Sequence, residues 1–139
     1  MLFKICSIIL ILIPFLSYSQ SVDSWKLYLN EKQLASATED SIPTVQVHKR
    51  DTSALKFVFA GSDTAFIRKV IVMNKQRNGI DSKTAAANAI KVVFNVQELN
   101  RLSHGEDLIF YIVKIPANPA KAALVRVAPR PICNLQWIP

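Results

Sequence analysis

The stretch KVVFNVQELNRLSHGEDLIFYIVKI, residues 91–115, decides the fold. Its first part alternates apolar and polar side chains, with Val92, Phe94 and Val96 on one side. A period of two residues is typical of a half-buried β-strand. Its last part, residues 108–115, is apolar on both faces, which predicts a strand that is central in its sheet or covered by other parts of the protein.

A short helix is expected between these two strands. Asn95 followed by Glu98 fits a capping box, in which side chains satisfy the first unpaired amides of a helix. Leu99 and Leu102 lie on one side of this helix, and Gly105 is the expected stop. The chain is therefore predicted to cross from one strand to the next through one or two helical turns.

The same alternation of two residues recurs outward from this stretch in both directions. It predicts further strands at residues 25–29, 44–48 and 55–59. Residues 33–37 are expected to return from the first of these as a hairpin, and residues 66–73 are apolar on both faces like 108–115. Residues 124–128 and 132–137 complete the predicted strands. Residues 82–89 are alanine-rich and fit either a helical turn or an edge strand, and Asn118-Pro119 predicts a second helical turn. We therefore expect an all-β fold, a single antiparallel two-sheet β-sandwich of seven or eight strands with one or two short helical turns.

Part of the central stretch resembles a known class of β-sandwich. The residues that carry the resemblance are Leu99, Leu102, Gly105, Leu108, Phe110 and Ile112. Their order is similar to the crossover between the two sheets of fibronectin type III and other immunoglobulin-like domains. The resemblance implies an immunoglobulin-like arrangement of the strands.

Residues 1–19 are predicted to be a signal peptide, which leaves 20–139 as a single domain. Lys4 supplies the positive charge, residues 5–16 carry none, and the small residues Ser17 and Ser19 lie three and one positions before the expected cut. As a helix the apolar run spans only about 18 Å, against roughly 30 Å of bilayer hydrocarbon. We expect a periplasmic or extracellular protein with no transmembrane span after signal cleavage.

A second resemblance concerns the leader and the C-terminal part of the chain. Small secreted proteins of Bacteroidetes-type bacteria are similar to this chain in the leader end Ser-Tyr-Ser before Gln20 and in the segments 114–116, 125–127 and 132–133. The resemblance implies export from a bacterial cell, and it implies no particular activity.

The composition excludes several classes of protein. The 139 residues carry a net charge of +7, are 50% hydrophobic, and include three glycines and two cysteines. These values exclude collagen, a disordered chain, a disulfide-dense scaffold and a four-cysteine zinc site. After the leader only Cys133 remains, and it is expected to be buried, reactive or paired between chains. Its alternation with Leu135 and Trp137 favours burial.

Basic residues gather towards the C-terminus. Residues 108–139 contain Lys114, Lys121, Arg126 and Arg130 and no acidic residue. A basic surface attracts acidic partners, here an acidic glycan or a lipid headgroup, although an ordinary solvated surface is the alternative. Nucleic acid is not expected as a partner, because the sequence contains no recognition helix and no aromatic stacking motif.

A catalytic interpretation has few candidate residues. His48, His104, Glu106 and Asp107 are the polar residues that a small periplasmic hydrolase or metal-dependent enzyme would use. The sequence contains no zincin motif, nucleophile elbow or phosphate-binding loop, and no cofactor is expected. A turn between a helix and a strand is the favoured explanation of the last three residues, because such residues are common there for capping and solubility.

These observations favour a secreted or periplasmic, non-enzymatic binding or interaction module of a bacterial cell envelope. Its partner would be an envelope protein, an acidic glycan or a lipid headgroup. Two alternatives remain open: the small enzyme described above, and a structural subunit of an envelope assembly that is buried along the face of residues 108–115.

Overall fold

A computed structural model describes residues 24–37, 41–60, 66–85, 91–124 and 128–139 of the chain. Two helices lie in these ranges, α2 (Val96–Ser103) and α3 (Pro119–Ala122). The strands are β1 (Trp25–Leu29), β2 (Lys32–Ser36), β3 (Thr44–His48), β4 (Ala54–Phe59), β5 (Phe66–Asn74), β6 (Gly79–Ala85), β7 (Lys91–Asn95), β8 (Leu108–Pro116) and β9 (Arg130–Ile138). Neither helix is long and apolar enough to cross a lipid bilayer.

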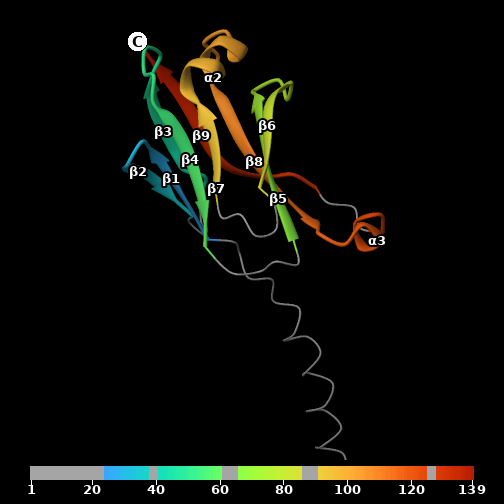
Figure 1. Ribbon diagram of the computed structural model, residues 1–139. Coiled ribbons are helices and arrows are strands. Elements are labelled where there is room, and N and C mark those ends of the chain that lie inside the picture. The colour runs from blue at the N-terminus through green and yellow to red at the C-terminus, as the bar shows by residue number, and fades with distance from the viewer. Residues whose placement is uncertain (1–23, 38–40, 61–65, 86–90, 125–127) are drawn as a thin grey trace, which may run out of the picture.

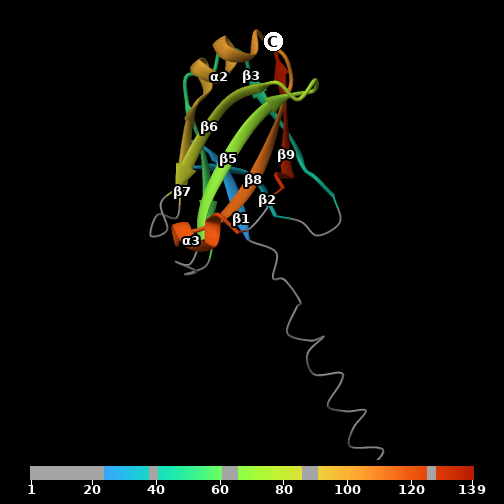
Figure 2. The same cartoon turned by 90° about the vertical axis from the view of Figure 1, so that its right-hand side faces the viewer.

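The strands form two sheets that lie against each other (Figure 1). One sheet has four strands in the order β2-β1-β4-β7, and the other has five in the order β3-β9-β8-β5-β6. Figure 2 shows β6, β5, β8 and β9 side by side in the five-stranded sheet. The prediction of an all-β fold with two sheets is confirmed.

The core lies between the sheets and is built from the apolar side of each alternating strand. Leu27 of β1, Phe57 of β4 and Phe94 of β7 are fully buried from the four-stranded sheet. Phe110 of β8 meets them from the other sheet, with its ring centroid 5.0 Å from that of Phe57. The period-two pattern therefore identified the buried faces correctly.

The predicted crossover helix is present. Asn95 caps α2, because its side-chain oxygen accepts a hydrogen bond from the backbone amide of Glu98 at 3.2 Å. Gly105 lies just beyond the helix at φ 76°, in the left-handed region that favours glycine. Asn118 likewise caps α3 by accepting from the amide of Ala120 at 3.0 Å.

Three details of the prediction are wrong. The described residues contain nine strands rather than seven or eight, since residues 79–85 form the edge strand β6. The sandwich is not entirely antiparallel, because β3 runs parallel to β9. No hairpin links these two strands, so no tight turn forces them to be antiparallel. Leu124 lies in the turn after α3 rather than in a strand, and 125–127 lie outside the described residues.

The doubly apolar strand β8 has the central position that was expected, with β9 on one side and β5 on the other. Its inward side chains are buried. On the opposite face Ile109, Tyr111 and Ile115 are half-buried, so the described residues cover this face only in part.

Candidate functional site

The outer face of the four-stranded sheet carries a group of lysines. On β1, Trp25 and Leu27 point into the core, and the residue between them, Lys26, is exposed on the opposite face with Tyr28. The same alternation turns Lys56 and Val58 outward on β4 and Lys91 and Val93 outward on β7. We call these six residues the lysine face: Lys26, Tyr28, Lys56, Val58, Lys91 and Val93.

The strand register arranges the lysine face in two rows. Lys26 lies opposite Val58, which in turn lies opposite Lys91. In the next row Tyr28 lies opposite Lys56, and Lys56 lies opposite Val93. Each lysine therefore has an apolar or aromatic neighbour on the adjoining strand, so the positive charges alternate with apolar contact area.

The distances between the three lysines of this face follow from the geometry of the sheet. Neighbouring strands are about 4.8 Å apart, which puts the backbones at Lys26 and Lys91 roughly 10 Å apart. Lys56 lies on β4, the strand between them, two positions before the Val58 that separates Lys26 from Lys91. The three ammonium groups have no carboxylate among the other members of the face, so an anionic ligand would relieve their mutual repulsion.

The lysine face is partly ordered by one contact within it. The Nζ of Lys56 lies 5.5 Å from the centroid of the Tyr28 ring. A cation over an aromatic ring at an exposed site contributes about 0.5–1 kcal/mol. Lys56 and Tyr28 are half-buried, while Lys26 and Lys91 are exposed and Val93 is 44% exposed.

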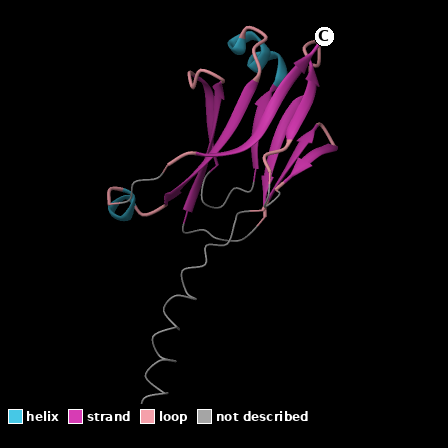
Figure 3. Ribbon diagram, turned by 180° about the vertical axis from the view of Figure 1, so that it is seen from behind, coloured by secondary structure: helices cyan, strands magenta, loops and turns pink. Residues whose placement is uncertain are grey.

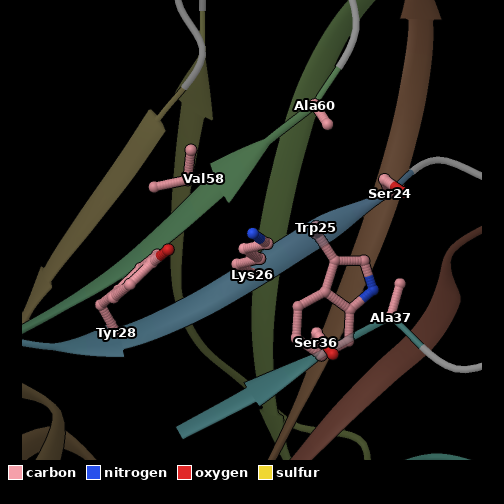
Figure 4. A pocket seen from close by; sticks show the side chains of 8 residues that line it. All are labelled: Ser24, Trp25, Lys26, Tyr28, Ser36, Ala37, Val58 and Ala60. Carbon is pink, nitrogen blue, oxygen red and sulfur yellow. The ribbon is translucent and has the colours of Figure 1, made fainter. Parts of the chain in front are cut away.

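A hollow of about 440 Å³ opens at the Lys26 end of this face. Figure 4 shows Lys26, Tyr28 and Val58 on neighbouring strands around it. The lining is completed by Ser24, Trp25, Ser36, Ala37 and Ala60. It thus combines one ammonium group, three hydroxyl groups and an apolar wall, which suits a polar anion with some carbon surface.

The basic residues predicted from the sequence lie elsewhere. Lys114 is on β8, with its Nζ 4.8 Å from the centroid of the Phe66 ring. Lys121 is exposed on α3, and Arg130 is exposed at the start of β9. Arg126 lies outside the described residues. The three described residues therefore lie on β8, on α3 and at the start of β9, outside the lysine face.

The two candidate catalytic histidines have separate local environments. His48 ends β3, and its Nδ1 lies 3.2 Å from the carbonyl oxygen of Pro139. His104 caps the C-terminus of α2 in a left-handed conformation, with φ at 54°. Both are exposed. Among the described residues, no three His, Cys, Asp or Glu side chains are grouped as a metal site would require.

The two candidate carboxylates form contacts that fix a loop. Glu106 accepts a hydrogen bond from the Asn74 side chain at 3.3 Å. Asp107 accepts from the backbone amide of Trp137 at 3.3 Å and forms a salt bridge with Lys75 at 3.4 Å. These contacts attach the turn before β8 to the ends of β5 and β9.

Cys133 is fully buried on the inner side of β9. Burial raises the pKa of its thiol to about 12, because the thiolate would lose its hydration. The thiol is therefore protonated at neutral pH and is unsuited to act as a nucleophile.

Sequence analysis missed the lysine face as a site, although its signal was present. Lys26, Lys56 and Lys91 each alternate with core residues, which places them on the solvent-facing side of their strands. What the alternation could not show is that β1, β4 and β7 are neighbours in one sheet. Comparison of the chain with protein-family models, with curated proteins and with solved structures finds no match.

Proposed function

We propose that this protein is an exported, non-enzymatic binding module of the bacterial cell envelope, and that its ligand is an acidic glycan. The observation that carries the proposal is the lysine face. Lys26, Lys56 and Lys91 present three positive charges across three neighbouring strands, alternating with Tyr28 and two valines.

This pattern favours a glycan over a lipid headgroup. A chain of acidic sugars offers carboxylates at intervals and carbon-bound hydrogens on the ring faces between them. Ammonium groups would pair with the carboxylates, while Tyr28, Val58 and Val93 would contact the sugar rings. The hollow beside Lys26 would accept one sugar unit, with Ser24 and Ser36 near its hydroxyl groups.

The non-enzymatic part of the proposal is supported by the contacts of the candidate catalytic residues. Glu106 and Asp107 are engaged with Asn74, Lys75 and the Trp137 amide, which gives both carboxylates a role in holding a loop.

We further propose an immunoglobulin-like arrangement. Two features support it: β4 pairs with β7 in one sheet, and β5, β8 and β9 are neighbours in the other. Strands B and E, and strands C, F and G, are grouped in this way in immunoglobulin domains. The helical link α2 between β7 and β8 passes from one sheet to the other, as the resemblance implies.

The test is retention of residues 20–139 on an immobilised acidic polysaccharide, polygalacturonate, compared with a neutral dextran matrix. We expect the variant with Lys26→Gln, Lys56→Gln and Lys91→Gln to bind about tenfold more weakly, at roughly 0.5 kcal/mol per lysine. A control variant with Lys69→Gln, Lys83→Gln and Lys121→Gln has the same net charge and alters other surfaces.

The control should bind polygalacturonate like the unmodified protein. Equal weakening in both variants would show that net charge alone governs retention, and it would overturn the assignment of the lysine face. Absence of selective retention by the unmodified protein would overturn the glycan proposal itself.

A further inference from the structure

The part of the chain that follows β8 and contains α3 projects away from the two sheets (Figures 1 and 3). The described tip, residues 117–124, reads ANPAKAAL and contains one charged residue, Lys121. Leu124 at its end is 86% exposed, the highest value among the exposed large hydrophobic side chains of the described residues. Pro119, Ala120 and Ala123 are exposed beside it.

The backbone amides of residues 120–124 are satisfied within the tip. The amides of Lys121 and Ala122 donate to the Asn118 carbonyl oxygen, at 3.1 and 3.0 Å. The Leu124 amide donates to the Lys121 carbonyl oxygen, and the Asn118 side chain accepts from Ala120. A segment that enters the edge of a lipid bilayer must pair its own amides in this way, because little water is available there.

The charged residues of the chain segment that contains the tip have one sign. Lys121 is exposed on the tip, and Arg130 is exposed where β9 begins. The sequence from 108 to 139 contains no aspartate or glutamate. Long basic side chains place their charge at the headgroup level while their stems follow apolar surface. Each such residue near an anionic membrane strengthens binding by about fivefold.

From these observations we propose that the α3 tip docks on an anionic lipid bilayer. Leu124 and Ala123 enter the boundary between headgroups and acyl chains, and Lys121 and Arg130 contact lipid phosphates. This surface is separate from the lysine face, so the inference stands or falls independently of the proposed glycan binding.

The experiment is cosedimentation of residues 20–139, which include every described element, with lipid vesicles. One set is pure phosphatidylcholine, and the other contains phosphatidylglycerol as the anionic lipid. We expect binding to the anionic vesicles, about tenfold or more weaker for Leu124→Ser, because a leucine side chain is no longer buried. Lys121→Gln should weaken it about fivefold.

Ile42→Ser and Lys83→Gln are matched controls, since they change an exposed isoleucine and an exposed lysine outside both the α3 tip and the lysine face. Both should bind vesicles like the unmodified protein. Unchanged vesicle binding by Leu124→Ser would overturn the proposal, as would equal binding to neutral and anionic vesicles. If the unmodified protein binds anionic vesicles but not polygalacturonate, only the proposed function is overturned. If it binds polygalacturonate but not anionic vesicles, only this inference is overturned.

Discussion

Lys56 and Tyr28 lie directly opposite each other on β4 and β1, and the Lys56 ammonium group lies 5.5 Å from the centre of the tyrosine ring. An exposed lysine normally samples many rotamers, and ordering it for a ligand costs entropy. Because the ring attracts the ammonium group, part of this cost is met before a ligand arrives. Lys56 thereby occupies the middle of the lysine face in advance of binding.

Replacement of this ring should therefore weaken binding to an acidic polysaccharide. Tyr28→Leu removes the ring and keeps an apolar side chain, so we expect the Kd for polygalacturonate to rise about two- to fivefold. Tyr28→Phe keeps the ring and should stay close to the unmodified protein. Titration calorimetry at low salt measures both values. A large loss in Tyr28→Phe would instead assign the effect to the hydroxyl group.

Phe57 joins the two sheets and should dominate the stability of the core. Its ring centroid lies 5.0 Å from that of Phe110 across the sheet interface, and 5.8 and 6.4 Å from the Trp25 and Phe94 rings. We expect Phe57→Ala to lower the free energy of unfolding by about 3–5 kcal/mol in urea titrations. Val93→Ala, on the exposed side of β7, should change it by less than about 0.5 kcal/mol. Similar losses in both variants would contradict this description of the core.

Local features of the fold were predictable because they depend on nearby residues. Alternation identified Phe57 and Phe94 as core residues, and the spacing of Asn95 and Glu98 identified the cap of α2. Both signals involve side chains separated by only a few positions in the chain. The physical cause is therefore contained within one short segment.

Long-range pairing could not be predicted in the same way. Val47 lies opposite Trp137, and the parallel pairing of β3 with β9 depends on contacts between segments 90 residues apart. The lysine face has the same origin, because the positions of Lys26 and Lys91 on opposite sides of Val58 depend on the register of three strands. Neither register is encoded in a local pattern.

Cys133 should be unreactive in the folded protein. Its side chain is fully buried, and burial raises the thiol pKa to about 12, so almost no thiolate forms at pH 8. We expect a disulfide reagent such as Ellman's to label the native protein slowly and the urea-unfolded protein at once. Rapid labelling without urea, or a disulfide-linked dimer on a non-reducing gel, would show that the thiol is accessible.

Asp51 connects the loop before β4 to the first hairpin. Its Oδ1 accepts a hydrogen bond from the Ser53 amide at 2.7 Å, and the Ser53 hydroxyl oxygen accepts one from the Asn30 side chain at 2.8 Å. Asn30 lies in the turn between β1 and β2 with φ at 53°. Hydrogen bonds from Ser53 to the carboxylate lower the pKa of Asp51 below its usual value of 3.8.

The lowered pKa predicts how this contact contributes to stability as the pH changes. Since the folded protein favours the ionised form, the contribution is complete above about pH 4 and is lost as the pH falls through the folded pKa. Asp51→Asn removes the charge at every pH, so it should be less stable than the unmodified protein at pH 7. The difference should shrink towards zero in acid.

Urea titrations of both proteins at pH 7, 5 and 3 measure this difference directly. Asp81→Asn is the control, because the Asp81 carboxylate accepts a local hydrogen bond from the amide of the adjacent Ser82 and lies on the edge strand β6. A gap between Asp51→Asn and the unmodified protein that widens on acidification would require a folded pKa above the unfolded one. That result would mean that burial, rather than the hydrogen bonds from Ser53, governs this carboxylate.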